Sequence, residues 1–253
     1  MTTFGVALAE AARDYRYLLD RGYPEPSSIA LVGNRHRLDA EERLMLFRGL
    51  ASISDSERRR LRAASPREGD LVLLDAYNVV FTIVHYYLGK PCFLSSDGYL
   101  RDVGANYGRV PHEELLRRVF GELAAFLAPR GLSIEAFFDA PVSRSGEHAA
   151  ALREAFTVAG IPAEVRVGAS ADGAIGARIE SFLGARRPDG PIEGEVGSAG
   201  RPRGLLVASS DSVLVDRAPA AWDLARGFLE SRHGAVFPDF RPILDGPPRE
   251  AEA

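Results

Sequence analysis

The chain has 253 residues, of which 46% are hydrophobic and 26% are charged, so it can bury one sizeable core and a smaller second unit. Its formal net charge of −4 argues against general coating of nucleic acid, although local basic clusters can still bind phosphate. Cys92 is the only cysteine, which excludes an intramolecular disulfide and a thiolate metal cage.

The sequence carries no sign of membrane insertion. No apolar segment approaches the roughly 20 residues that span a bilayer. The first residues include acidic side chains and lack a cleavage-like site, unlike a secretory signal. We therefore expect a cytoplasmic protein without a membrane or disulfide-linked partner, and nothing in the sequence specifies an oligomeric state.

Residues 1–65 are predicted to form a small helical domain. Phe4–Leu19 has apolar residues with a 3.6-residue period, which predicts the first helix. A second helix over Ile29–Gly33, capped by the serines before it, should follow. A third helix should begin at Asp39, which forms a capping box with Glu42.

Two basic clusters in this domain are candidate nucleic-acid contacts. The two short helices resemble a helix-turn-helix in length, with basic residues in the turn that can touch phosphate; the alternative is a helical cap with a solvated turn. The run Glu57–Arg62 is either a nucleic-acid contact or a solvated helix face. The candidate phosphate contacts are Arg35, Arg37, Arg58, Arg59 and Arg60.

Residues 66–242 are predicted to form an α/β domain with a doubly wound, mainly parallel sheet, because strand and helix patterns alternate. The predicted strands are Leu71–Leu74, Ile134–Phe138, Pro162–Val167 and Gly204–Ser209. The turn-rich segment after Pro91 suggests a hairpin or active-site loop, whereas a helix containing Trp222 and an edge strand at Val236–Phe237 should close the domain. Residues 186–203 are expected to be a flexible insertion, and 243–253 a disordered tail.

Aspartates follow three of the apolar strands. Asp75, Asp139 and Asp211 should therefore meet at the carboxyl edge of the sheet, and Asp172 should begin a helix nearby. One such aspartate is commonly a turn or cap residue, but several together repel one another unless a cation neutralises them. Hard oxygen ligands select Mg²⁺ or Mn²⁺, which can activate water beside a scissile phosphate. The pattern predicts a metal-dependent nuclease site.

The same motifs resemble the successive acidic motifs of the PIN and NYN ribonuclease superfamily. They are DAYNV at 75–79, FFDAPVS at 137–143, ADGAIGARI at 171–179 and ASSDSVLVD at 208–216. With its DYRYLLDRGYP and LVGNRHRL segments, the whole chain also resembles an uncharacterised prokaryotic family that joins a small helical domain of unknown function to a PIN-like domain.

This resemblance implies roles for individual residues. It makes Asp75, Asp139, Asp172 and Asp211 the metal carboxylates, Asn78 an orienting amide, and Ser209 and Ser210 contacts to phosphate or water. Arg144 precedes a helix whose start can face an anion and is a further candidate substrate contact. The NYN pattern usually has a second acid two residues after Asp211, where this chain has Val213, so we expect weak activity.

The expected function is a metal-dependent endoribonuclease, with RNA as its partner. The alternative is a PIN-like fold that binds RNA or a protein without cutting. The chain lacks the motifs of other enzyme classes. It has no G-x-S-x-G elbow of a Ser-His-Asp hydrolase and no G-x-G-x-x-G of a dinucleotide-binding fold after the first strand. Tyr77 stands where a haloacid-dehalogenase-type phosphatase has its second aspartate. His148 can assist a leaving group, but a solvent-facing histidine at a helix start is the simpler expectation.

Overall fold

The computed structural model describes residues 4–104, 112–184 and 203–245, and these residues fall into two compact units. Of the described residues, the first unit comprises 4–61, 85–104 and 229–245, and the second comprises 62–84, 112–184 and 203–228. The helices α5 (Ala76–Tyr87) and α10 (Leu224–His233) each run from one unit into the other. The first unit thus includes more than the N-terminal helices, because a hairpin and the end of the chain pack with them.

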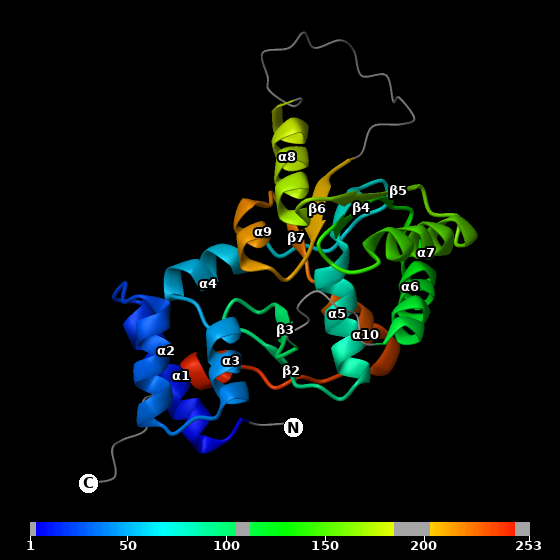
Figure 1. Cartoon of the computed structure of the whole chain (residues 1–253). Helices are drawn as coiled ribbons and strands as arrows, with labels where there is room; N and C mark the ends of the chain where they lie inside the picture. The colour runs from blue at the N-terminus through cyan, green and yellow to red at the C-terminus, as the bar shows by residue number, and fades with distance from the viewer. Residues whose placement is uncertain (1–3, 105–111, 185–202, 246–253) are drawn as a thin grey trace. The chain divides into compact units, whose positions relative to one another are not determined.

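The first unit is mainly helical (Figure 1). Its elements are α1 (Val6–Leu19), α2 (Glu25–Arg35), α3 (Ala40–Gly49), α4 (Ile53–Arg60), the antiparallel hairpin β2 (Cys92–Leu94) and β3 (Leu100–Asp102), and α11 (Arg241–Asp245). Its core gathers Tyr15, Leu46, Phe93 and Phe240, and the Phe240 ring stacks on Phe4 with centroids 4.1 Å apart. This arrangement confirms the predicted helical N-terminal region and the predicted hairpin.

The start of α3 follows the prediction, whereas the start of α2 does not. Asp39 accepts a hydrogen bond from the Glu42 backbone, and Glu42 accepts one from the Asp39 backbone, which completes the capping box. Helix α2 begins at Glu25 instead of Ile29, so the expected serine caps lie inside it and Ser28 is buried. The earlier start has a local cause, because Pro26 in the first turn lacks an N–H group that would need a partner.

The second unit is built on a five-stranded sheet in the order β5-β4-β1-β6-β7, with every neighbouring pair parallel. Its strands are β1 (Leu71–Asp75), β4 (Ser133–Asp139), β5 (Ala163–Gly168), β6 (Leu205–Ala208) and β7 (Ala221–Trp222). Strand β1 is central and every residue in it is buried, as its continuous apolar run predicts. The predicted α/β class and mainly parallel sheet are confirmed.

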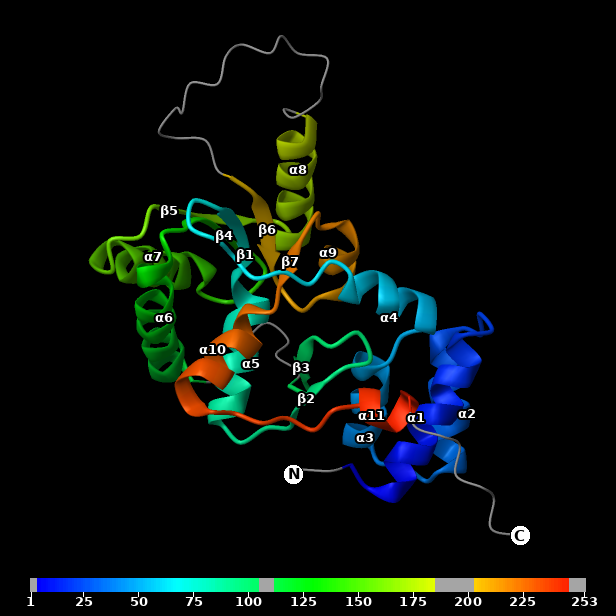
Figure 2. The same cartoon turned by 180° about the vertical axis from the view of Figure 1, so that it is seen from behind.

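Helices cover both faces of this sheet (Figures 1 and 2). They are α6 (Glu113–Leu127), α7 (Ser145–Val158), α8 (Ala171–Gly184) and α9 (Ser212–Arg217), with a 3-10 turn at Ala128–Arg130 after α6. On one face, Phe138 packs edge-on against Tyr77 of α5 and Phe120 of α6. On the opposite face, Glu135 pairs with Arg178 of α8. The alternation along β4 thus sends neighbouring side chains to different layers.

The chain after β6 differs from the prediction. Trp222 belongs to the short edge strand β7, which follows α9. The helix predicted to contain Trp222, Leu224 and Phe228 is present as α10, but it begins at Leu224. Val236 and Phe237 form no strand. Residues 243–245 of the predicted disordered tail instead form the end of helix α11. The rest of that tail and residues 186–202 of the predicted insertion lie outside the described residues. In the described part of the chain, no helix combines the length and apolar content needed to cross a bilayer.

Candidate functional site

Three neighbouring strands present an aspartate at the same edge of the sheet. Asp75 is the last residue of β1 and Asp139 the last residue of β4, which pairs with β1. Asp211 follows β6 on the other side of β1 and is the N-cap of α9. Asp172 lies in the first turn of α8. The four acidic motifs therefore converge at the carboxyl edge, where parallel sheets place their ligand sites.

A hydrogen-bond network fixes Asp75, whose exposed fraction is only 5%. The Ser209 hydroxyl donates to Asp75 Oδ2 over 2.9 Å. The same hydroxyl oxygen accepts a bond from the Asp211 backbone N–H. Asn78 Oδ1 accepts bonds from both the backbone N–H and the hydroxyl of Ser210. The start of α5 is thereby tied to the turn after β6, which gives Asn78 and both serines positions beside Asp75.

The other carboxylates also bind backbone donors. Asp139 Oδ1 accepts from the Ala171 N–H over 2.8 Å and so holds the start of α8 at the end of β4. Asp211 Oδ1 accepts from the N–H groups of Val213 and Leu214, as a helix cap does. Structural cap residues make the same bonds, so these contacts fit both a capping role and a metal-binding role.

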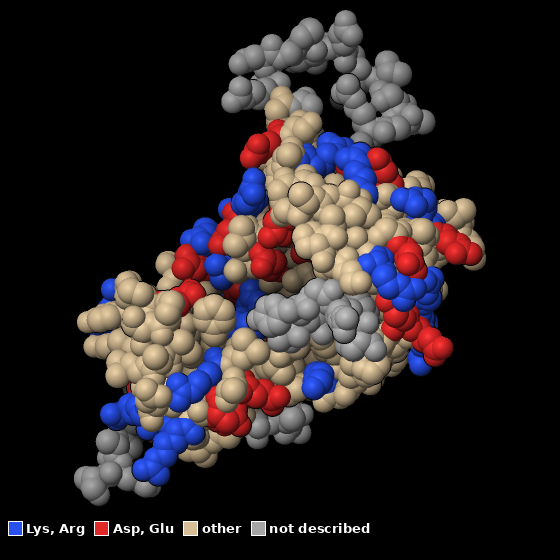
Figure 3. All heavy atoms as spheres, viewed as in Figure 1, with Lys and Arg blue, Asp and Glu red and all other residues tan. Residues whose placement is uncertain are grey.

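Two of the four carboxylates, Asp75 and Asp172, have a raised pKa. Burial, followed by the charges of Asp172 and Asp211, raises the pKa of Asp75 to about 8, although the Ser209 hydrogen bond opposes the change. The pKa of the exposed Asp172 is also raised, first by partial desolvation and then by Asp211 and Asp139, against an opposing effect of Arg217. Acidic side chains gather beside α8 and α9 in Figure 3. This edge of the sheet carries a concentration of negative charge.

The donor chemistry of this edge fits a hard divalent cation, because carboxylate and hydroxyl oxygens dominate it. The spacing is wider than we predicted, however. The described residues contain no group of three histidine, cysteine, aspartate or glutamate side chains placed to hold one ion. A shared ion would therefore require at least one of the four carboxylates to move closer to the others.

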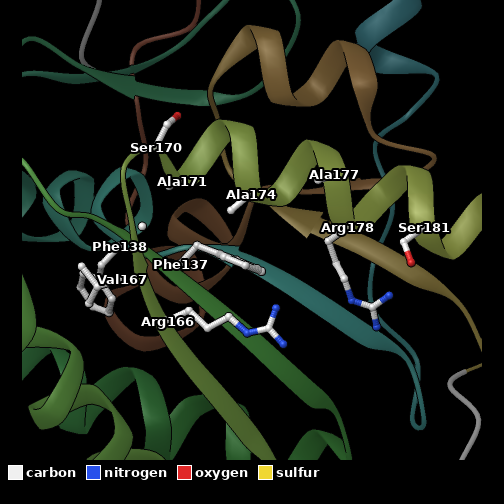
Figure 4. Close-up of a pocket in the computed structure, with 11 residues that line it drawn as sticks. Phe137, Phe138, Arg166, Val167, Ser170, Ala171, Ala174, Ala177, Arg178 and Ser181 are labelled. Carbon is white, nitrogen blue, oxygen red and sulfur yellow. The ribbon is translucent and has the colours of Figure 1, made fainter.

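A pocket of about 400 Å³ opens next to this edge, between α8 and the strands β4 and β5 (Figure 4). Arg166 of β5 and Arg178 of α8 line it, and their side chains extend toward one another. Both arginines pair with Glu135, Arg178 in a bidentate manner and Arg166 at 3.9 Å. Sequence reasoning did not select either arginine, because their convergence depends on the packing of α8 on β5.

The arginines predicted to contact phosphate mostly have protein partners. Arg144, the N-cap of α7, pairs with Glu113 at 3.0 Å and with Glu147. The remaining candidates belong to the first unit and pair as follows: Arg35 with Asp14, Arg58 with Asp55, Arg59 with Asp97, and Arg60 with the Ser96 carbonyl. Arg37 has a positive φ of 53° after α2. The Arg59 side chain is only 13% exposed, so the basic run is not a uniformly solvated face.

His148 differs most from its predicted setting. It is fully buried in the first turn of α7, so the expectation of a solvent-facing histidine was wrong. Its Nδ1 atom lies 2.8 Å from the Tyr77 hydroxyl, and its Nε2 atom lies within hydrogen-bond distance of the Glu113 carboxylate. No motif spacing indicates this cluster, because its members come from three helices.

Comparison with known proteins gives the family. Residues 65–227 match the family described as a domain of unknown function, DUF5616. The chain belongs to the DUF5616 family. Its N-terminal residues 7–62 match a second family described as a protein of unknown function, DUF434. The DUF5616 match extends from just before β1 into α10 and so includes all four aspartates.

The relative of this DUF5616 chain described next is itself uncharacterised, so it gives no activity for comparison. An uncharacterised protein of Methanocaldococcus jannaschii is 27% identical over 164 residues, which cover 63% of this chain and 78% of that protein. No solved structure matches the chain. Because neither family match names the PIN or NYN superfamily, that resemblance remains a hypothesis.

Proposed function

We propose that this DUF5616 chain has a PIN-like fold and is a metal-dependent endoribonuclease. The observation that carries the proposal is the position of Asp139, Asp75 and Asp211 at the carboxyl ends of three adjacent parallel strands. One aspartate at a strand end is ordinary. Here three aspartates end adjacent strands, and Asp172 lies in the first turn of α8. Together they concentrate negative charge, which costs free energy in the unliganded chain. Function is a common reason to retain such a cost.

The proposed ligands of Mg²⁺ or Mn²⁺ are Asp75, Asp139, Asp172 and Asp211. When bound, such an ion would offset charge on the scissile phosphate and lower the pKa of a water molecule. The chain's own contribution is orientation. Ser209 holds the Asp75 carboxylate through its hydroxyl, and Asn78 fixes the backbone of Ser210 just before Asp211.

Substrate contacts are proposed on the same grounds. The hydroxyl groups of Ser209 and Ser210 and the exposed guanidinium of Arg144 are candidates for phosphate oxygens near the aspartates. The candidates of the helical unit, Arg35, Arg37, Arg58, Arg59 and Arg60, are further proposed RNA contacts. Arg35, Arg58 and Arg59, like Arg144, are already paired with an acid and must exchange that partner for phosphate.

One observation favours a second candidate function. The described residues include no three acidic side chains spaced to hold one ion, and the exposed Val213 stands where the NYN pattern usually has a second acid. Both are expected of a PIN-like fold that binds RNA or a protein without cutting it. Weak cleavage and no cleavage are therefore the two outcomes to separate.

Metal binding tests the proposal first. Calorimetric titration of the full chain with Mn²⁺ should give a saturable signal that Asp75→Asn abolishes or strongly weakens. Asp70→Asn is the matched control, because Asp70 is also buried but precedes β1 at the opposite end of the strand. Equal binding by the wild type and Asp75→Asn, or no binding by the wild type, would contradict a metal site at this edge.

A further inference from the structure

His148 is a buried polar side chain that the proposed chemistry does not use. Its exposed fraction is 0%, and both of its ring nitrogens have partners on other helices. Nδ1 lies 2.8 Å from the hydroxyl oxygen of Tyr77, and Nε2 lies 3.1 Å from Glu113 Oε2. A buried imidazole with two side-chain partners holds a defined orientation, since either broken bond would leave a buried polar group unpaired.

Tyr77 connects this histidine to the aspartate edge. It is buried in the first turn of α5, two residues after Asp75. Its ring packs edge-on against Phe138 with centroids 4.8 Å apart, and Phe138 directly precedes Asp139. Tyr77 therefore follows one proposed metal ligand by two residues, and its side chain contacts the residue that precedes another.

Glu113 and Arg144 complete the cluster on the opposite side of the ring. Arg144 Nη1 lies 3.0 Å from Glu113 Oε1, so the carboxylate joins the first turn of α6 to the segment before α7. Arg144 itself has a φ of 63°, in the left-handed region that a residue with a side chain rarely adopts. Such a conformation persists where the surrounding contacts hold it, which indicates that this end of α7 is tightly constrained.

The partners define how the protons are arranged. Nε2 faces a carboxylate, which only accepts hydrogen bonds, so Nε2 carries the hydrogen. In the neutral imidazole, Nδ1 is then the acceptor, and the Tyr77 hydroxyl donates to it. For the neutral ring, these bonds run in one direction from Tyr77 through His148 to Glu113.

We propose that His148 is a positioning residue for the aspartate edge, acting through Tyr77. Through the Tyr77 hydroxyl and the contact of Tyr77 with Phe138, its ring holds the first turn of α5 against the end of β4, beside Asp75 and Asp139. The metal-binding consequence of this role rests on the proposed function. The positioning itself does not, and it is measurable in the metal-free chain.

Three substitutions separate the two bonds of the histidine. Tyr77→Phe removes the hydroxyl. His148→Asn keeps an amide where Nδ1 lies and can still bond Tyr77, whereas His148→Gln reaches the position of Nε2 and can bond only Glu113. Leu152→Ala is the control, because Leu152 is fully buried one turn further along α7 and takes no part in the network.

The first measurement is hydrogen exchange by mass spectrometry on each full-length, metal-free variant. We expect faster exchange over residues 75–84 in Tyr77→Phe and His148→Gln, and wild-type exchange there in His148→Asn. Leu152→Ala should instead affect α7 and the neighbouring β5. Unchanged exchange over 75–84 in both Tyr77→Phe and His148→Gln, or equal effects of the Asn and Gln variants, would overturn the positioning role.

The second measurement is Mn²⁺ titration of the same variants. Tyr77→Phe and His148→Gln should bind Mn²⁺ roughly tenfold more weakly, as removal of groups that orient metal ligands commonly does, whereas His148→Asn and Leu152→Ala should bind like the wild type. Faster exchange without weaker Mn²⁺ binding would overturn the role in positioning the metal ligands. A wild-type chain that binds no Mn²⁺ would defeat the proposed function, while the exchange data would still decide whether His148 positions this segment.

Discussion

Replacing Asp75 by asparagine should make the metal-free chain more stable, and the gain should depend on pH. Asparagine has the shape of the protonated aspartate, and its carbonyl oxygen can still accept the bond that Ser209 donates. It removes the ionisable group, whose charged form burial, Asp172 and Asp211 disfavour. The substitution therefore removes a cost of folding and keeps the main hydrogen bond.

The magnitude follows from the change in the Asp75 pKa. Its pKa rises from 3.8 to about 8 on folding, so the folded state holds a proton that the unfolded state loses. The contribution of this bound proton to the free energy of unfolding is fully present below pH 3.8 and is lost as pH rises toward 8. At about 1.4 kcal/mol per pKa unit, the loss is roughly 4 kcal/mol at pH 7 and roughly 6 kcal/mol above pH 8. The Asp75→Asn variant has no ionisable group at this position, so its free energy of unfolding does not include this loss.

The assay is urea unfolding of the full chain with EDTA between pH 4 and 9, with melting temperature as a second readout. The advantage of Asp75→Asn should be near zero at pH 4, grow to pH 8 and then level off, with a melting difference on the order of 10 °C at pH 7. A variant that unfolds more easily than the wild type at pH 7 and 8 would refute the charge argument and make Asp75 a structural cap.

Substitutions at three further places test separate parts of the proposed function. Asp211→Ala should lower metal-free stability by about 1 kcal/mol, because it removes the cap of α9, whereas Asp211→Asn should keep the cap and stabilise the chain; both should lose any Mn²⁺-dependent rise in melting temperature. Val213→Asp should strengthen Mn²⁺ binding measured by calorimetry, since it restores the acid that the NYN pattern usually has. Arg58→Glu combined with Arg60→Glu should weaken RNA binding and flatten its dependence on salt, because fewer counterions are released.

Each of these outcomes has a clear opposite. Equal unfolding of the Asn and Ala variants at 211 would remove the cap argument. Unchanged Mn²⁺ affinity in Val213→Asp would place that side chain away from the metal, as its exposed fraction of 56% allows. An unaltered salt slope in the double arginine variant would assign α4 to packing.

The sheet could be predicted from the sequence because its signals are local. A short apolar run such as Leu71–Leu74 indicates a covered strand, and alternation of such runs with helices implies parallel pairing. Once the strands are parallel, their carboxyl ends share one edge, so the placement of Asp75 and Asp139 follows from chain order alone. The capping box at Asp39 was predictable for the same reason, since it depends on two residues three positions apart.

The contacts between distant residues could not be predicted in this way. Tyr77 and His148 are 71 positions apart, and Glu113 lies on a third helix, so no spacing rule connects them. Arg59 appeared to belong to a solvated basic run, but its pairing with Asp97 depends on how the hairpin region packs against α4 within the first unit. The short strand β7 was missed because two residues carry no periodicity.

Cleavage of RNA tests the central claim most directly. The full chain should cut single-stranded or structured RNA slowly in the presence of Mg²⁺ or Mn²⁺, should stop when EDTA is added, and should lose activity in Asp75→Asn. Val213→Asp should cut at least as fast as the wild type. If neither the wild type nor Val213→Asp cuts any RNA in a broad panel, although both bind the metal, the nuclease proposal is wrong and the chain is a binding module.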